Sequence, residues 1–227
     1  PMGPVVHGVD TGFLVLNERT YPHLLALFAQ LGVDVAPSDM SFSVQVPGAG
    51  WRGGPLEWSG SSLSSVFAQR SNLINGRFWR MLADLMRFNR LATQLAQGLD
   101  DPEQAERLMQ PLGDFLQAQG FSAAFRDWYL LPMLGCIWRC PTDPMLPFPV
   151  ATLVRFCHNH GLIQVSNRPQ WFTVPGGSRR YVERIVAGVA DARLATPVLR
   201  VLRDAAGVTV VTARGAERFD KVVLATH

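Results

Sequence analysis

The spacing of apolar residues divides the chain into regions of different periodicity. In residues 20–32 apolar side chains recur at helical intervals, and Gly32 is expected to end this short helix. From residue 77 to residue 160, three- and four-residue spacing predicts a succession of amphipathic helices. After about residue 162 the period changes. The pattern there predicts short strands, one helix over residues 178–189, and three further strands separated by turns.

One glycine-rich stretch has the spacing of a dinucleotide-binding loop. VPGAGWRGG, residues 46–54, contains the G-x-G-x-x-G glycines Gly48, Gly50 and Gly53. Such a loop needs a strand before it and a helix after it. Here residues 41–46 alternate as a strand does, but LEWSG after the loop alternates as well. The pattern therefore predicts a β-hairpin in place of a phosphate loop.

Residues that start and stop helices support the helical interpretation of the central region. Asp101 is a cap followed by Pro102 at the first helical position, and Ser122 is a second cap. Gly120 follows an apolar repeat and is expected to end a helix. The apolar segment after Ser122 contains Pro132, which predicts a kink at that point.

Composition places the chain among folded globular proteins. It has 227 residues, of which 48% are hydrophobic and 17% charged, enough for one large domain or two interleaved ones. No apolar run approaches the roughly 20 residues of a membrane-spanning helix, so we expect a cytoplasmic protein without a transmembrane segment. The net charge of +3 is small and the arginines are scattered, which disfavours nucleic-acid binding. Three cysteines fit a reducing compartment.

The two ends of the sequence predict a fragment. The chain begins at Pro1 and has no initiator methionine in front of it. It closes on FDKVVLATH, in which residues 222–225 form a continuous apolar run. Such a run predicts a strand buried on both faces, and folded domains seldom stop at the end of one.

Cysteines and histidines near the end of the helical region raise the question of a metal site. The residues are Cys136, Cys140, Cys157, His158 and His160. A zinc site needs paired ligands on a tight turn, whereas these pairs lie in or beside apolar helices and the two histidines point to different sides of one. We therefore expect buried thiols and no metal. A serine hydrolase is also disfavoured, because the sequence has no G-x-S-x-G elbow.

The order of elements in the last third of the chain is more specific. A turn VPGGS is followed by a helix and then by RLATPVLRVLRDAAGVTVVTARGAERFDKVVLATH. This arrangement resembles the flavin-containing amine oxidase superfamily, and within it the bacterial amine-oxidase-like proteins predicted to bind FAD or NAD. The resemblance covers nearly the whole chain and includes HGVDTGFLVLNERTYPHL, LEWSGSSLSSVFAQR, FRDWYLLPMLGCIWRCP and NRPQWFTVPGGSRRYV.

The resemblance implies an α/β fold in which a partial FAD-binding Rossmann-like domain carries an inserted, largely helical substrate domain. Residues 1–19 and 166–227 would belong to the FAD-binding domain, and residues 20–165 to the substrate domain with its β-hairpin. In the family, the G-x-G-x-x-G unit precedes the segment that matches residues 8–16 here. The resemblance therefore assigns no pyrophosphate or ribose contact to this chain.

The resemblance also implies which residues approach FAD. The backbone of Val198 would hold the adenine, and the end of the strand VVLAT would approach the cofactor at Ala225 and Thr226. Residues of VDTGF and VPGG would lie near the isoalloxazine, namely Thr11, Gly12, Phe13, Pro175, Gly176 and Gly177. Small residues at these places permit a close approach of the backbone to the ring.

The activity implied by the resemblance is that of an FAD-dependent oxidoreductase that transfers a hydride from a small molecule to the flavin. No catalytic base is assigned, because Lys221, the only lysine, does not match the lysine that many amine oxidases place near the flavin. The apolar helices around Trp128, Trp138 and Phe156 suggest an apolar or lipid-like substrate. A non-catalytic binding module on the same scaffold is the alternative, and the sequence assigns no oligomeric state.

Overall fold

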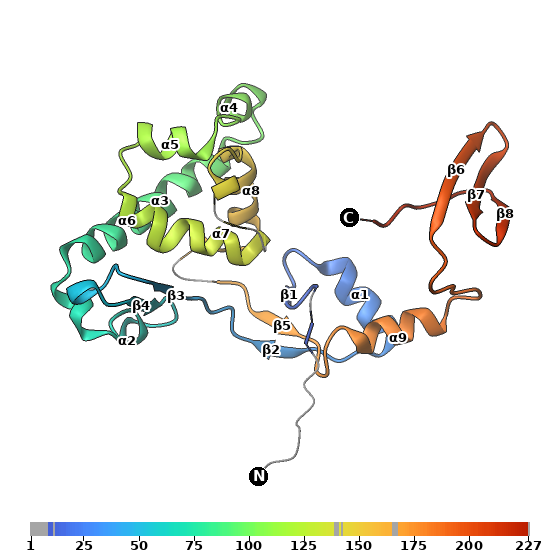
Figure 1. The fold of residues 1–227 in the computed structure, drawn as a ribbon, viewed down its shortest axis with the longest axis horizontal. Helices are drawn as coiled ribbons and strands as arrows, with labels where there is room; N and C mark the ends of the chain where they lie inside the picture. Colours follow the sequence, from blue (N-terminus) through green and yellow to red (C-terminus); the bar gives the residue numbers. More distant parts are fainter. Residues whose placement is uncertain (1–8, 11, 139–140, 142, 165–167, 227) are drawn as a thin grey trace, which may run out of the picture. The chain divides into compact units, whose positions relative to one another are not determined.

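The computed structural model describes residues 9–226, apart from 11, 139–140, 142 and 165–167. The chain forms two compact units, Pro1–Ser178 and Arg179–His227. The first unit is mostly helical, and the second is built on a small antiparallel sheet (Figure 1). The chain therefore mixes helix and sheet, as the sequence predicts.

The helices of the first unit are short apart from α3. They are α1 (Pro22–Leu31), α2 (Leu63–Val66), α3 (Gly76–Gln97), α4 (Pro102–Arg107), α5 (Leu112–Ala118), α6 (Ala123–Phe125), α7 (Leu131–Trp138) and α8 (Val150–Asn159). Its strands are β1 (Leu16–Asn17), β2 (Ala36–Ser38), β3 (Ser43–Val46), β4 (Leu56–Ser59) and β5 (Trp171–Thr173). The predicted first helix is α1, and Gly32 ends it in the left-handed conformation with φ of 63°. None of the described helices has the length and hydrophobicity to cross a bilayer.

The long helix α3 begins where Asn75 caps it. The Asn75 side chain accepts hydrogen bonds from the backbone N–H groups of Arg77 and Phe78. One face of the helix is buried in the core and includes Phe78 and Phe88. The predicted amphipathic helix is confirmed, although Met86, which belongs to the same apolar repeat, is 50% exposed.

Helices α6 and α7 are joined by one wider turn. Ser122 caps α6, as predicted, by accepting a hydrogen bond from the N–H of Phe125 at 3.2 Å. Residues Arg126–Leu130 then form a π-helical turn, and α7 continues through Pro132. Proline has no N–H and its ring collides with the carbonyl of the previous turn, so a wider turn accommodates it. The irregularity predicted near Pro132 is therefore a π turn just before it.

Strands β3 and β4 form the predicted β-hairpin. They pair antiparallel, with Val44 opposite Trp58. Space requires a glycine at Gly50 of the connecting loop, because an added Cβ there would lie 2.2 Å from the carbonyl oxygen of Pro55. Gly48 and Gly53 instead have positive φ of 73° and 79°, which side chains disfavour. The G-x-G-x-x-G spacing in this loop thus belongs to a hairpin.

The hydrophobic core of the first unit lies between this hairpin and the helices (Figure 1). Aromatic rings fill much of it. Trp58 of β4 meets Phe78 of α3 with ring centroids 6.1 Å apart, and Phe125 of α6 meets Phe88 of α3 at 5.4 Å. The indole Nε1 of Trp58 also donates to the carbonyl oxygen of Trp128 at 3.2 Å. Hydrophobic burial, with oriented ring contacts in addition, stabilises this core.

A second small sheet joins distant parts of the first unit. Its strand order is β1-β5-β2, and both pairs are antiparallel. Phe172 of β5 lies opposite Leu16 on one side and Pro37 on the other. Beyond β1, the hydroxyl of Thr173 donates to the carbonyl oxygen of Leu14 at 3.0 Å. Residues 14–17 therefore run beside the segment that follows the helical region (Figure 1).

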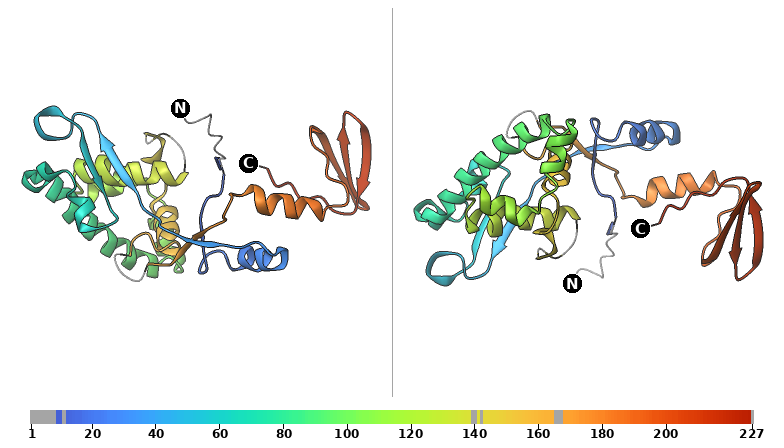
Figure 2. Two further views of the ribbon diagram at one scale, coloured as in Figure 1. Left: turned by 90° about the horizontal axis from the view of Figure 1, so that it is seen from below. Right: turned by 90° about the horizontal axis from the view of Figure 1, so that it is seen from above.

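The second unit begins with helix α9 and continues as a three-stranded antiparallel sheet in the order β6-β7-β8 (Figure 2). The bounds are α9 (Arg179–Ala187), β6 (Val198–Asp204), β7 (Gly207–Thr212) and β8 (Gly215–Phe219). The helix predicted over residues 178–189 is α9, and β6, β7 and β8 confirm the predicted succession of strands and turns after it. No side chain among the described residues of this unit is buried.

The apolar run at residues 222–225 does not form the predicted buried strand. Residues 221–226 have no regular secondary structure, and Val223 and Leu224 are 89% and 68% exposed. This prediction was wrong because a strand needs a neighbour that pairs its backbone groups. No strand in the described part of the chain pairs with this segment.

Candidate functional site

Two segments far apart in the sequence meet in the first unit, residues 9–13 and the turn at residues 174–178. Asp10 joins them. Its carboxylate accepts a hydrogen bond from the hydroxyl of Ser178 at 2.6 Å and from the Ser178 N–H at 3.1 Å. Hydrogen bonds to a carboxylate are stronger than those between neutral groups. The Asp10 carboxylate therefore fixes the turn against the earlier segment.

The turn depends on two glycines. Gly176 and Gly177 have φ of 83° and 80°, in the left-handed region that side chains disfavour. An added Cβ at Gly177 would also lie 3.0 Å from both carboxylate oxygens of Asp10. A side chain at Gly177 would therefore strain the backbone and displace the carboxylate that holds the turn.

The surface beside this contact carries little side-chain volume. Pro175, Gly176 and Gly12 are exposed, and an added Cβ at Gly12 would meet no atom within 4 Å. Open space next to exposed backbone allows a flat ring to approach closely. These residues therefore fit a planar cofactor ring such as a flavin. Thr11, which was predicted with them, lies outside the described residues.

Phe13 leads from this segment to a polar aromatic pair. Its ring meets Tyr21 edge to face, with centroids 5.2 Å apart. The Tyr21 hydroxyl lies 3.3 Å from Nε2 of His160, and His160 Nδ1 lies 3.0 Å from the carbonyl oxygen of Phe156. Since a carbonyl only accepts, Nδ1 carries the proton, and in the neutral ring Nε2 accepts from Tyr21. Burial raises the pKa of Tyr21, so this hydroxyl keeps its proton.

A cavity of about 600 Å³ lies beside this pair. It is lined by Arg19, Thr20, Tyr21, Phe156, Asn159 and His160. The Phe156 ring stacks on His160 with centroids 4.1 Å apart. Phe156 is the one apolar residue of this lining, so the cavity offers mainly polar groups to a small molecule, with one aromatic wall. Another cavity of about 640 Å³, lined by parts of α5 and α6, shares no lining residue with this one.

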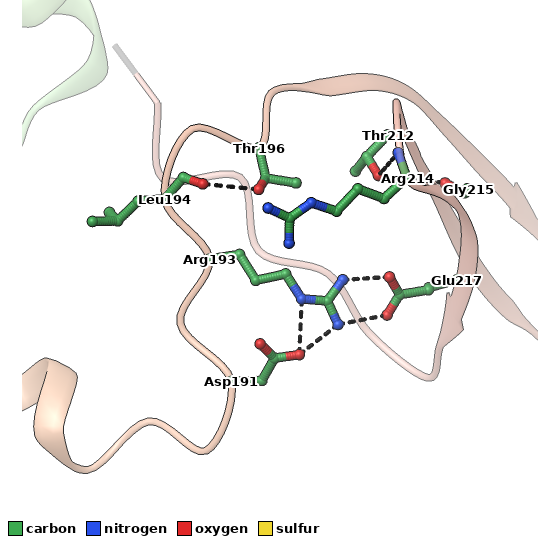
Figure 3. Close-up of polar contacts among 8 residues, drawn as sticks. All are labelled: Asp191, Arg193, Leu194, Thr196, Thr212, Arg214, Gly215 and Glu217. Atoms are coloured by element: carbon green, nitrogen blue, oxygen red, sulfur yellow. Dashed lines mark hydrogen bonds and ion pairs between the residues drawn. The ribbon is translucent and has the colours of Figure 1, made fainter.

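In the second unit, Arg193 holds the loop that leads into β6 (Figure 3). Its Nε lies 2.8 Å from the carboxylate of Asp191, and one of its terminal nitrogens lies 2.9 Å from the carboxylate of Glu217 in β8. Hydrogen bonds from Arg193 lower the pKa of both carboxyl groups. The same loop holds Ala195 in the left-handed region with φ of 49°. The ion pairs thus tie the loop to the sheet just before Val198.

Val198 begins β6 and is 53% exposed. The pairing register shifts between Val198 and Arg200, as it does at a β-bulge. A bulge takes backbone groups out of the ladder and leaves them available for other contacts. Ala225 and Thr226 are exposed in the irregular segment after β8. Contact between these residues and an adenine stays a prediction.

The residues considered as metal ligands do not form a metal site in the part of the chain that the structure describes, which excludes Cys140. No group of three or more His, Cys, Asp or Glu side chains is placed there to hold an ion. The expectation of buried thiols is confirmed for Cys157 and wrong for Cys136, which is exposed. Burial raises the pKa of the Cys157 thiol to about 12, so it is neutral near pH 7, whereas metals bind the thiolate. His160 instead bonds to Tyr21 and Phe156.

The three aromatic residues expected near a substrate have different surroundings. Phe156 lines the cavity beside His160. Trp138 packs on Phe156, with ring centroids 5.0 Å apart. Trp128 is 4% exposed and belongs to the helical core, so it fills space between helices.

Sequence reasoning missed the polar residues that position these segments, namely Asp10, Tyr21 and Arg193. The sequence contained a signal for Asp10. The segments VDTGF and VPGGS were both expected near the same ring, so a hydrogen bond between the aspartate of the first and the serine of the second could have been predicted. For Arg193 only the local partner Asp191 was visible in the sequence, since its other partner Glu217 is 24 residues away. His160 was considered only as a metal ligand or as a residue at the end of a helix.

Comparison with known proteins shows the family and the fold. The sequence model of a family described as flavin containing amine oxidoreductase matches residues 7–227. Among solved structures, the chain is similar to a wild-type putrescine oxidase bound to putrescine, with a TM-score of 0.63 and 17% identity over 94% of this chain and 46% of that chain. It is also similar to cyclohexylamine oxidase from Brevibacterium oxydans IH-35A, with a TM-score of 0.61 and 18% identity over 93% of this chain and 45% of that chain.

The two solved structures bear on the fold. The chain spans about half their length, 46% and 45%. Among curated proteins, none matches the chain.

Proposed function

Because the chain belongs to the family of flavin-containing amine oxidoreductases, we propose that it is part of an FAD-dependent oxidoreductase that oxidises a small molecule at the flavin. Residues 1–19 and 166–227 contribute to the FAD-binding domain in this proposal, and residues 20–165 form the substrate domain. The observation that carries the proposal within the chain is the contact of Asp10 with Ser178. This contact unites the two segments expected at the ring.

The isoalloxazine would lie against the surface that Asp10 organises. Gly12, Pro175 and Gly176 leave backbone exposed there, and Phe13 provides an apolar edge next to them. Gly177 supports the turn from behind, where it contacts the Asp10 carboxylate. We place Thr11 with this group on the resemblance alone.

The adenine end would be held by the second unit. Val198 offers backbone groups at an irregular point of β6, and Arg193 fixes the loop in front of it. Ala225 and Thr226 have small, exposed side chains that leave the backbone accessible. The resemblance assigns the adenine to Val198 and an approach to the cofactor to Ala225 and Thr226, and the exposure of these residues supports both assignments.

When bound, FAD supplies the two-electron chemistry by accepting a hydride. The residues of this chain orient the substrate and exclude water. The cavity beside Tyr21 and His160 is next to Phe13, and thus next to the surface proposed for the ring. Tyr21 and His160 position a polar group of the substrate through hydrogen bonds, and Phe156 contacts its apolar part.

The cavity also restricts the substrate class. Putrescine oxidase and cyclohexylamine oxidase are named for amines. The described lining of this cavity contains Arg19 and no carboxylate, so it does not suit a dication. We propose an apolar or lipid-like molecule that ends in a neutral polar group. We also place the protein in the cytoplasm, since Cys136 and Cys157 are free thiols.

Flavin content and flavin reduction test the proposal. The purified protein is incubated with FAD, freed of unbound cofactor and scored by visible absorbance. Long-chain and short-chain amines and alcohols are then added without oxygen, and bleaching of the flavin is recorded. We expect bound FAD and bleaching by long-chain compounds. These measurements are made on the full-length protein that contains this chain, because the chain itself carries no assigned pyrophosphate contact. A colourless full-length protein would refute the cofactor, and bound FAD without bleaching by any compound would favour a binding module.

A matched pair of glycine variants tests where the ring lies. An added Cβ meets no atom within 4 Å at Gly12 or at Gly76, so the variants Gly12→Val and Gly76→Val both start from a position with open space at the Cβ. At Gly12 the new side chain would occupy the space proposed for the ring and weaken FAD binding by about tenfold. Gly76→Val at the start of α3 should bind FAD normally. Equal FAD binding by both variants would contradict the placement.

A further inference from the structure

The segment from α2 to the middle of α3 exposes apolar side chains that a folded core would bury. Leu63 is 81% exposed, Ile74 70%, Met86 50%, Trp79 48% and Leu73 45%. Single exposed apolar residues are normal on protein surfaces, but a continuous group of them indicates an interaction site. We refer to these five residues as the 63–86 surface.

The ring of Phe67 connects α2 with α3 below the 63–86 surface. The N–H of Phe67 donates to the carbonyl oxygen of Leu63, and the Phe67 ring lies 5.2 Å from that of Trp79. The indole Nε1 of Trp79 donates to the carbonyl oxygen of Leu73 at 2.9 Å, which places the residue before Ile74 against the same helix.

The periodicity of α3 extends this group along the helix. Met86 follows Trp79 by seven positions, two turns along, and therefore lies on the same face. The exposed apolar residues of the 63–86 surface thus lie on neighbouring elements, namely α2, the turn after it, and α3.

The exposed charge within residues 59–98, which carry the 63–86 surface, is positive. The neighbouring strand β4 adds one exposed carboxylate, Glu57, which is hydrogen-bonded to the side chain of Gln45. Between Trp58 and Leu99 the sequence has no lysine and no glutamate, and its arginines are Arg70, Arg77, Arg80, Arg87 and Arg90. The one acidic residue of this stretch, Asp84, is 2% exposed. Its carboxylate is occupied within the fold by two of these arginines and by the N–H of Ser122. Arg70 and Arg90 are exposed and add uncompensated charge at the two ends of the patch.

We propose that the 63–86 surface docks on the face of an anionic lipid bilayer. Exposed leucine, isoleucine and tryptophan can insert into the boundary between head groups and acyl chains, while arginines beside them meet anionic head groups. Tryptophan suits this depth because its ring is apolar and its N–H is polar. The positive charge favours an anionic bilayer over a second copy of this chain. In a dimer through this surface, the arginines of the two copies would face and repel each other.

The inference does not rest on the proposed function, because vesicle binding requires neither FAD nor a substrate. If both hold, docking would give an enzyme of lipid-like molecules access to its substrate. A membrane-bound protein that takes up no FAD would disprove the proposed function alone. A protein that binds FAD but does not bind anionic vesicles would disprove the docking alone.

Co-sedimentation with vesicles tests the docking. Phosphatidylcholine vesicles with and without phosphatidylglycerol are mixed with the purified protein at low and raised NaCl. We expect binding to vesicles that contain phosphatidylglycerol, weakening with salt, and little binding to phosphatidylcholine alone. The double variants Leu63→Ser with Ile74→Ser, and Arg70→Glu with Arg90→Glu, should each lower the partition coefficient by about tenfold.

Matched controls come from the second unit. Leu194 is 89% exposed and Arg203 is exposed in β6, so Leu194→Ser and Arg203→Glu make the same changes of chemistry elsewhere. Both should bind vesicles like the unaltered protein, and circular dichroism should show that every variant is folded. Absence of binding to anionic vesicles would overturn the proposal, as would equal binding by the double variants. If the unaltered protein were a dimer that does not bind vesicles, and the double variant Leu63→Ser with Ile74→Ser were a monomer, the 63–86 surface would be an interface between two copies of the chain.

Discussion

At the scale of single residues, the contact of Asp10 with Ser178 makes the sharpest prediction. The two residues are 168 positions apart, and the carboxylate accepts from both the hydroxyl and the N–H of Ser178. Replacement Asp10→Ala should lower the free energy of unfolding by about 2 kcal/mol, and Ser178→Ala by about 1 kcal/mol. Because the residues share a hydrogen bond, the double variant should lose less than the sum. Urea unfolding of the four proteins measures this coupling.

Asp39→Ala is the control for this cycle, since Asp39 is exposed and lies outside the turn. It should change the free energy of unfolding by less than about 0.5 kcal/mol. Strictly additive losses in the double variant would show that Asp10 does not hold the turn.

At the scale of elements, Asp84 connects α3 to the start of α6. Its carboxylate accepts from the Ser122 N–H at 3.0 Å and pairs with Arg80 and Arg87 at 3.3 and 3.1 Å. Burial alone would raise the pKa of Asp84, but the hydrogen bonds from Ser122 and the charge of Arg80 outweigh it, so the pKa is lowered. The charged carboxylate therefore stabilises the junction between these helices.

The lowered pKa of Asp84 gives this stabilisation a pH dependence. It is fully present above the unfolded-state pKa of about 3.9 and is lost as the pH falls through the lower pKa of the folded state. Asp84→Asn should cost about 2 kcal/mol of unfolding free energy at neutral pH. The difference from the unaltered protein should shrink below about pH 4.

Urea unfolding at several pH values measures the effect of Asp84→Asn. Asp100→Asn, at an exposed aspartate after α3, should show neither the loss nor the pH dependence. A loss that stays constant down to acid pH would mean that the Asp84 charge is not its cause.

At the scale of the whole molecule, the two units differ in how they are stabilised. The first unit has a core that includes Phe78, Phe125 and Leu153, each fully buried. In the described part of the second unit no side chain is buried, so its sheet depends on backbone pairing and on ion pairs such as Arg193 with Glu217. Amides of α8 should therefore exchange with deuterium far more slowly than those of β6–β8.

Hydrogen exchange followed by mass spectrometry tests this difference in the chain of 227 residues. If FAD binds as proposed, its addition should slow exchange around Val198. β7 is the central strand of its sheet. If its amides exchanged as slowly as those of α8, this would contradict the expectation that burial of side chains determines the protection of amides from exchange.

Local sequence was sufficient for features whose causes lie within a few residues. The caps Ser122 and Asp101, the stop at Gly32 and the β3–β4 hairpin were all predicted and are present. Each depends on hydrogen bonds or backbone angles between near neighbours. The strand predicted at residues 222–225 failed for the opposite reason, because a strand needs a partner from elsewhere.

The sequence by itself determined the succession of helices and strands and the likeness to flavin-containing amine oxidases. It also determined that the glycine-rich stretch at residues 46–54 belongs to a β-hairpin and not to a phosphate-binding loop. Only the tertiary structure decided which polar side chains act together, such as Asp10 with Ser178 and Tyr21 with His160, over separations of 168 and 139 residues. It also decided that Trp128 is buried while Trp79 is exposed. Periodicity specifies which side chains share a face of an element, but burial and pairing depend on which other element covers that face.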